Sequence, residues 1–265
     1  MWSMGGGSRT VKVLQGVMLC WLLGWYIKCY FFLPYFLEVT FRVPVHHRLF
    51  PAFFENPLVS TICYLLPLIS VPAILRPGRR RMIFTTALMA VCSFILMGHI
   101  NTYNDATFVT SFWVALWMLF VAWRYDVAER ETAEQACPIA SWMMGVIFLA
   151  GAVGKLTPEY LSGEAFFRIF WPDNVTWPHS WLLATYSKSQ LATISFYMSR
   201  MIIGMELFLA GIPFYGSRHK YWVAPVILVC FTITNTWAIL SVLSCLIGMM
   251  LGCWFLSGRK ATADA

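Results

Sequence analysis

Charged residues are scarce in this chain of 265 residues. They make up 12% of the sequence, whereas a soluble domain carries about 25%. Hydrophobic residues make up 59%, and the mean hydropathy is +0.67. So little polar surface cannot cover a globule in water, which excludes a soluble protein and makes lipid the expected solvent. Apolar segments and short connectors fill the chain, so we expect one membrane domain over residues 1–265 and no sizeable domain outside the bilayer.

The cysteines lack the spacing of a metal or redox site. No two of the eight cysteines are separated by two residues, and none lies three positions before a histidine. Seven lie inside apolar runs, and Cys137 lies at the boundary of one. This pattern predicts small hydrophobic side chains and no metal site.

Internal repeats and low-complexity segments are absent as well, and the chain is instead a succession of long apolar runs. A helix needs about 20 apolar residues to cross a bilayer. The last run, residues 222–256, would be about 52 Å long as one helix, so we expect a break near Thr232–Asn235. The prediction is an all-α, polytopic bundle of about eight transmembrane helices, with seven as the alternative. The expected spans are 13–37, 58–75, 82–98, 108–123, 138–156, 191–215, 222–238 and 240–256.

Lysine and arginine are distributed unevenly over the connectors. With the N-terminus in the cytoplasm, twelve of the nineteen fall on the inner side, five on the outer side and two within spans. This asymmetry predicts a cytoplasmic N-terminus, and eight spans keep Arg259 and Lys260 inside. We therefore assign the net charge of +7 to topology and to the lipid bilayer as partner, and not to nucleic acid.

One cation stands out because of its position. Lys155 lies at the end of the apolar stretch Ile147–Leu156, where a charge is costly unless it is paired, reaches the headgroups or serves a function. In the predicted topology it faces the outer side. Desolvation disfavours the charged form of a lysine, so a lysine in a partly dry pocket can act as a base.

Other polar residues fall on the same side in this topology. Three asparagines, one histidine and one aspartate follow the third span or mark the predicted break before the last one. Their side chains can orient a carbonyl or a hydroxyl by hydrogen bonding. We predict Lys155 as a catalytic residue and, as substrate-binding residues, His99, Asn101, Asn104, Asp105 and Asn235.

Structural roles are open for the same kinds of residue. Lys155 can reach the outer headgroups, and asparagines can cap or join helices. Lys28 in the first span, and Arg200 and Glu206 in the sixth, are expected to pair across helices, with Lys28 and Glu206 as one candidate pair.

The segment Pro158–Trp181 is short and amphipathic. It mixes phenylalanine, isoleucine and tryptophan with acidic and basic residues. We expect it to lie in the outer interface, either as a lid over Lys155 or as a connector.

The residues around Lys155 resemble those of a known family. Leu149–Gly163, read as LAGAVGKLTPEYLSG, is similar to the membrane segment of the vitamin K-dependent gamma-glutamyl carboxylases and of their bacterial relatives, the horizontally transferred transmembrane domain (HTTM) proteins. In that family a similar A-G-x-x-K-L carries the lysine regarded as the catalytic base, which Lys155 matches. Gly98–Asp105 and Cys230–Asn235 look similar in order and spacing.

The resemblance implies a helical membrane scaffold with one outward-facing lysine and, by analogy, a quinone or hydroquinone as cofactor or ligand. The chain departs from the family at Asn101 and Thr232, where histidines are expected, and it has no counterpart of the large lumenal domain. The resemblance therefore does not extend to the carboxylation of glutamate in a protein substrate.

Three hypotheses for function follow, and enzymatic activity is left open among them. The first is a membrane enzyme that uses Lys155 as a base on a lipophilic, quinone-like substrate. The second is a non-catalytic subunit of a larger redox or biogenesis complex, with other membrane subunits as partners. The third is a small-solute transporter, which would require paired broken helices, whereas the sequence predicts only one break.

Overall fold

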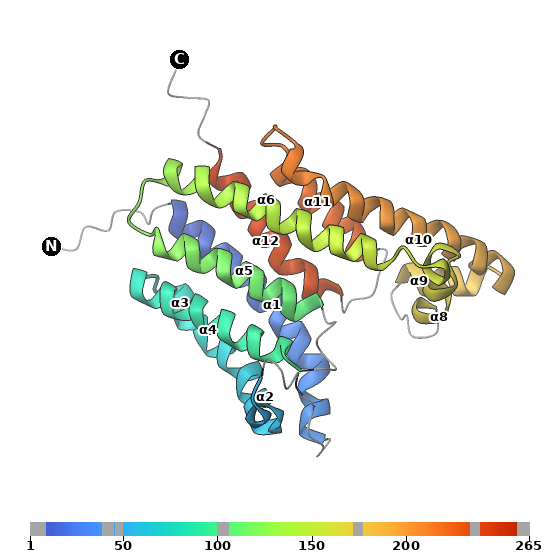
Figure 1. Ribbon diagram of the computed structural model, residues 1–265, viewed down its shortest axis with the longest axis horizontal. Coiled ribbons are helices and arrows are strands. Elements are labelled where there is room, and N and C mark those ends of the chain that lie inside the picture. The colour runs from blue at the N-terminus through green and yellow to red at the C-terminus, as the bar shows by residue number, and fades with distance from the viewer. Residues whose placement is uncertain are drawn as a thin grey trace. The chain divides into compact units, whose positions relative to one another are not determined.

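The protein is helical throughout the part of the chain that the computed structural model describes, namely residues 9–38, 45, 50–99, 106–171, 177–233 and 239–258 (Figure 1). In these ranges the only pairing of strand type is an isolated antiparallel bridge between Val45 and His99. The all-α prediction is confirmed. The α-helices are α1 (Arg9–Glu38), α2 (Pro57–Leu65), α3 (Val71–Leu75), α4 (Arg79–Met97), α5 (Ala106–Trp123), α6 (Glu129–Gly154), α7 (Pro158–Leu161), α8 (Glu164–Phe170), α9 (Trp177–Thr185), α10 (Lys188–Ala210), α11 (Lys220–Ile233) and α12 (Leu240–Leu256). Short 3-10 helices are η1 (Ala52–Glu55), η2 (Leu66–Ser70) and η3 (Ile212–Phe214).

Several of these helices have the length and composition of membrane spans. Among the described residues, five helices are long and apolar enough to cross a membrane: Arg9–Tyr30, Arg79–Met97, Ala106–Trp123, Glu129–Gly154 and Lys188–Phe214. Three shorter apolar helices cover Pro57–Ser70, Lys220–Thr232 and Leu240–Leu256. Each of the predicted spans overlaps one of these helices.

The helices form two compact units. One contains Met1–Ala140 together with Leu240–Ala265, and the other contains Ser141–Ile239. The division falls inside α6, so this helix contributes to both. The single membrane domain of residues 1–265 stays a prediction.

The first unit is organised by a close contact between α1 and α12. A Cβ on Gly24 of α1 would lie 2.3 Å from Oγ of Ser244, and one on Gly248 would lie 2.6 Å from Cβ of Cys20. Ser244, Gly248 and Gly252 recur at intervals of four and so share one face of α12. Small residues on facing helices let the backbones approach closely, which is how helices associate where burial from water does not drive them together.

Two tryptophans of α1 connect this helix to its other neighbours. The rings of Trp21 and Trp25 are stacked with centroids 4.6 Å apart, and both side chains are fully buried. Nε1 of Trp21 donates to the carbonyl of Ser111 in α5 at 2.9 Å, and Nε1 of Trp25 donates to the carbonyl of Tyr64 in α2 at 2.8 Å. Each buried polar group of the indoles thus has an acceptor.

In the second unit, the C-terminal part of α6 runs antiparallel to the C-terminal part of α10. A Cβ on Gly145 would lie 2.7 Å from Cγ of Pro213, just beyond α10, whereas Gly151, further along α6, faces Glu206, which is earlier in α10. Glycine at both positions of α6 allows this close approach.

The short helices α7 and α8 pack against the N-terminal half of α10. Gly163, between them, has a φ of +81°, which glycine adopts without steric cost. A Cβ there would lie 2.5 Å from the backbone nitrogen of Phe196 in α10. Beyond α8, Nε1 of Trp171 donates to Oγ of Ser195 at 2.6 Å. These contacts fix the α7–α8 segment onto α10.

Candidate functional site: a buried lysine–glutamate pair

Lys155 is positioned by the end of α6. Helix α6 ends at Gly154, and Pro158 begins α7. Proline disfavours helical backbone in the residue before it, and Thr157 accordingly has extended angles. Its side chain caps α7 by accepting a hydrogen bond from the backbone nitrogen of Tyr160 at 3.3 Å. Lys155 therefore lies in the last turn before the chain changes direction.

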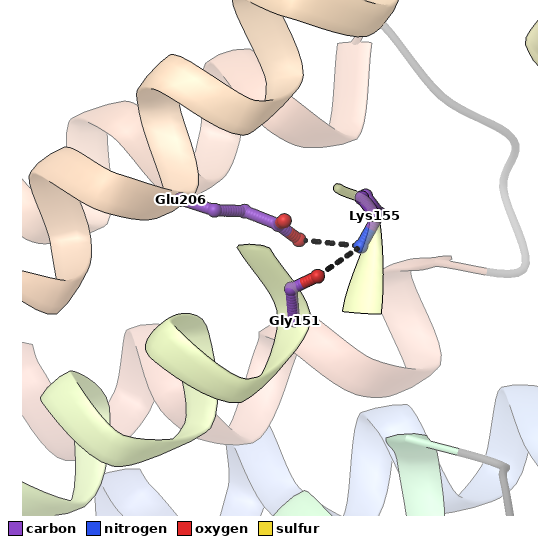
Figure 2. Close-up of polar contacts among 3 residues, drawn as sticks. All are labelled: Gly151, Lys155 and Glu206. Carbon is purple, nitrogen blue, oxygen red and sulfur yellow. Dashed lines mark hydrogen bonds and ion pairs between the residues drawn. The ribbon is translucent and has the colours of Figure 1, made fainter. Parts of the chain in front are cut away.

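The partner of Lys155 is Glu206 of α10. Nζ of Lys155 lies 2.8 Å from Oε1 of Glu206 and 3.4 Å from the carbonyl oxygen of Gly151. Figure 2 shows the lysine turned back toward Gly151 on its own helix, while Glu206 reaches Nζ from α10. The lysine side chain is 29% exposed and the glutamate side chain is 6% exposed. The carboxylate is thus enclosed by protein, whereas part of the lysine can be reached from outside.

The absence of a side chain at Gly151 makes room for this carboxylate. A Cβ on Gly151 would lie 3.0 Å from Oε1 and 3.5 Å from Oε2 of Glu206. Gly151 therefore borders the pair directly, four residues before Lys155 and on the same face of α6.

The second carboxyl oxygen of Glu206 is in a different environment from the first. Oε2 is buried and has no hydrogen-bond partner among the described residues. A buried polar atom without a partner costs free energy of the order of 1–3 kcal/mol, and more when it is charged. Such an atom in a native protein requires an explanation in terms of protonation, a ligand or water.

Tyr160 of α7 lies next to the pair. Nζ of Lys155 is 5.9 Å from the centroid of its ring, near the outer limit of a cation–π contact. Burial raises the pKa of the Tyr160 phenol. The phenol therefore keeps its proton at neutral pH and cannot serve as the base.

The remaining predicted site residues are distributed differently. His99 belongs to the first unit, where it is buried and its Nε2 lies 2.9 Å from the carbonyl of Phe54 and 3.1 Å from Oγ of Ser60. It thereby joins the end of α4 to η1 and α2. The other four lie outside the described residues: Asn101, Asn104, Asp105 and Asn235. Their roles in binding stay predictions.

The pairing of Lys28 with Glu206 was a wrong prediction. Glu206 contacts Lys155 instead, because the antiparallel arrangement of α6 and α10 brings these two residues to the same level. Lys28 is buried in the first unit, with Nζ 5.3 Å from the centroid of the Phe108 ring. Arg200 is exposed and stacks on Phe196, with Cζ 3.4 Å from the ring centroid.

Glu206 is the functional candidate that sequence reasoning did not include in the site. A signal for it exists, since Glu206 is the only acidic residue between Asp173 and Asp264 and lies in an apolar run. What the sequence does not contain is the identity of its partner, which is 51 residues away.

The segment Pro158–Trp181 forms α7 and α8 and then enters α9. Both α7 and α8 pack on α10, and Tyr160 of α7 is the residue that approaches Lys155.

Within the described part of the chain, no group of three or more His, Cys, Asp or Glu side chains is arranged to hold a metal ion. Comparison of the chain with protein-family models, with curated proteins and with solved structures finds no match.

Proposed function

We propose that this protein is a multi-pass membrane protein with a scaffold like that of the vitamin K-dependent carboxylase membrane region, and that Lys155 acts as a base on a lipophilic, quinol-like substrate. The observation that carries the proposal is the pair formed by Lys155 and Glu206, in which a partly exposed amine contacts a buried carboxyl group. Intramembrane ionisable residues are expensive and mark functional sites by default.

The outward face of α6 supports a membrane boundary just after Lys155. Exposed residues of this face are apolar up to Leu156, as at Val146, Leu149 and Val153. Beyond it, the exposed residues Thr157 and Glu159 are polar or charged. This change is expected where a helix leaves the hydrocarbon region.

The outward face of α10 changes in the same way at Arg200. Exposed residues before this point include Gln190, Thr193 and Arg200 itself, whereas those after it include Met201 and Leu207. We therefore infer that polar groups accompany α10 on its exposed face as far as Arg200, within the helix Lys188–Phe214 that is long and apolar enough to cross a membrane.

The two boundaries agree with the packing of the helices. Gly151 faces Glu206 in the antiparallel arrangement, so five residues further along α6 and five residues back along α10 bring Leu156 level with Met201. The same level on both helices thus marks the change from apolar to polar exposed residues. Glu206 lies six residues after Arg200, or about 9 Å along the helix axis, which supports a position of the pair in the outer part of the apolar layer.

The remaining topology follows from the helices and the charges. The five long helices and the three shorter apolar ones support eight spans. The excess of lysine and arginine in the alternate connectors supports a cytoplasmic N-terminus.

The geometry favours Lys155, and not Glu206, as the group that meets the substrate. Its side chain is 29% exposed, whereas that of Glu206 is 6% exposed. As a free amine, Nζ takes the proton of a quinol hydroxyl: the O–H bond breaks, an N–H bond forms, and a quinol oxyanion and a lysine ammonium result. A general base of this kind requires hydrogen-bond reach to the proton that it removes.

The test uses menadiol, a small naphthohydroquinone, with the full chain in lipid nanodiscs under anaerobic conditions at neutral pH. We expect the ultraviolet spectrum of bound menadiol to show the oxyanion in the wild type and the neutral quinol in Lys155→Met. The exposed Lys188→Met serves as the control and should retain the wild-type spectrum. An oxyanion signal that persists in Lys155→Met, or that is absent from the wild type, would overturn the proposal.

A further inference from the structure

The hydrogen-bond pattern of Glu206 bears on where the proton of the pair resides. Oε1 lies 2.8 Å from Nζ of Lys155, and Oε2 is buried without a hydrogen-bond partner in the described part of the chain. An ionised carboxylate carries charge on both oxygens, so an enclosed and unpartnered Oε2 would be a desolvated partial charge. In a carboxylic acid with its proton on Oε1, Oε2 is an uncharged carbonyl oxygen, whose burial costs less.

The surroundings of Lys155 point the same way. Apart from Glu206, Nζ has a carbonyl oxygen at 3.4 Å and an aromatic ring at 5.9 Å. The first contact is long for a hydrogen bond, and the second is at the limit for a cation–π contact. Among the residues that the structure describes, little other than Glu206 therefore offsets the desolvation of an ammonium in this place.

We propose that Glu206 is the proton-accepting partner of Lys155 and that the resting pair is neutral, with a carboxylic acid at Glu206 and a free amine at Lys155. The neutral form and the ion pair contain the same number of protons and differ in one transfer: an N–H bond breaks at Nζ and an O–H bond forms at Oε1. A buried ion pair gains only part of its desolvation cost from mutual attraction, so the apolar surroundings favour the neutral form.

The catalytic consequence of this assignment rests on the proposed function. The assignment explains how a lysine in contact with a carboxyl group can be a base. The amine carries a lone pair because Glu206 already holds the proton, and the hydrogen bond from Oε1 has to open before that lone pair takes a proton from the substrate. Glu206 does not touch the substrate in this arrangement and acts through Lys155 as a positioning residue. Gly151 belongs to the same arrangement, because the absence of a side chain there leaves the space that the carboxyl group of Glu206 occupies.

Infrared spectroscopy of the full chain in lipid nanodiscs at neutral pH, without any quinol, tests the proton position. We expect the wild type to show a carboxylic-acid C=O band that shifts when glutamate is labelled with ¹³C and that is lost in Glu206→Gln. The labelled wild type keeps the test decisive if that variant does not fold. Glu164→Gln is the matched control, because Glu164 pairs with Arg168 at an exposed site and should contribute no such band.

Two substitutions of the lysine separate a neutral pair from an ion pair. In Lys155→Met the acid band should remain, since no cation is present. In Lys155→Arg it should disappear, because a guanidinium does not give up its proton. A wild type that lacks the band, while Lys155→Met shows it, would establish an ion pair and overturn the inference. The menadiol experiment is independent: a neutral pair with no oxyanion formation rejects the proposed function alone, and the reverse result rejects only the neutral resting state.

Discussion

Gly151 and Glu206 meet across α6 and α10, with 3.0 Å between the position of a Cβ on the glycine and Oε1 of the glutamate. Gly151→Ala should push the carboxyl group away from Lys155 and lower the free energy of unfolding by about 1 kcal/mol, as slight overpacking does. Gly154→Ala is the control on the same helix, since no atom lies within 4 Å of its Cβ position. Thermal unfolding in detergent compares the two, and equal midpoints would contradict the tight contact.

The coupling between Lys155 and Glu206 should be measurable in a double-mutant cycle. Lys155→Met leaves a buried carboxyl group without its hydrogen-bond partner, which costs about 1–3 kcal/mol. Replacing both residues, as Lys155→Met with Glu206→Leu, removes the polar group as well and should recover much of that loss. The exposed pair Arg168 and Glu164 provides the control cycle, with an expected coupling of about 0.3–0.5 kcal/mol. Coupling no larger than in the control would contradict a buried interaction.

Gly163 should tolerate no side chain. Its φ of +81° disfavours other residues by about 1–2 kcal/mol, and the Phe196 backbone lies 2.5 Å from the Cβ position. Gly163→Ala should therefore detach α7 and α8 from α10 and increase the rate of proteolysis in this segment. Gly216→Ala, where the Cβ position is open, should leave the rate unchanged. Protection equal to that of the wild type in Gly163→Ala would show that the segment is not held in this way.

The contact between α1 and α12 can be tested with two glycines of α1. Gly24→Ala places a Cβ 2.3 Å from Oγ of Ser244 and 2.7 Å from the carbonyl oxygen of Ser241, so the helices must separate. Overpacking of this kind costs about 1–3 kcal/mol. Gly16→Ala has open space around its Cβ position and should stabilise the helix by up to about 1 kcal/mol. Opposite shifts of the unfolding midpoint are expected, and a stabilising Gly24→Ala would contradict the close contact.

The proposed membrane boundary predicts a pattern of chemical labelling. Cysteines at Thr157 and Arg200 should react with a charged, membrane-impermeant maleimide added to the outer side of intact vesicles. Cysteines at Leu149 and Leu207 should be protected, because a charged reagent does not enter the hydrocarbon region. Mass spectrometry distinguishes the introduced cysteines from the native ones. Labelling of all four positions at similar rates would show that the membrane boundary lies deeper along α6 and α10 than the Lys155–Glu206 pair.

Much of the fold was predictable because it depends on local composition. Apolar runs separated by polar connectors, proline and glycine predict the helices, and the end of α6 follows from Thr157 and Pro158. The predicted span 191–215 overlaps α10 and η3, but hydropathy alone does not reveal where the exposed face of α10 changes from polar to apolar. The first half of that helix buries Ser195 and Leu191 against its own unit while exposing polar residues, and only packing separates these two faces.

The amino-acid sequence by itself determined that the chain is helical and apolar and that a lysine ends one of its apolar runs. Those properties depend on residues that are neighbours in the chain. The partner of that lysine was decided only by the tertiary structure, because the antiparallel packing of α6 on α10, allowed by Gly145 and Gly151, brings Glu206 within 2.8 Å of Nζ. A buried carboxyl group has to be matched by whichever polar group the packing delivers, and for Glu206 that group is Lys155 and not a neighbour in the sequence.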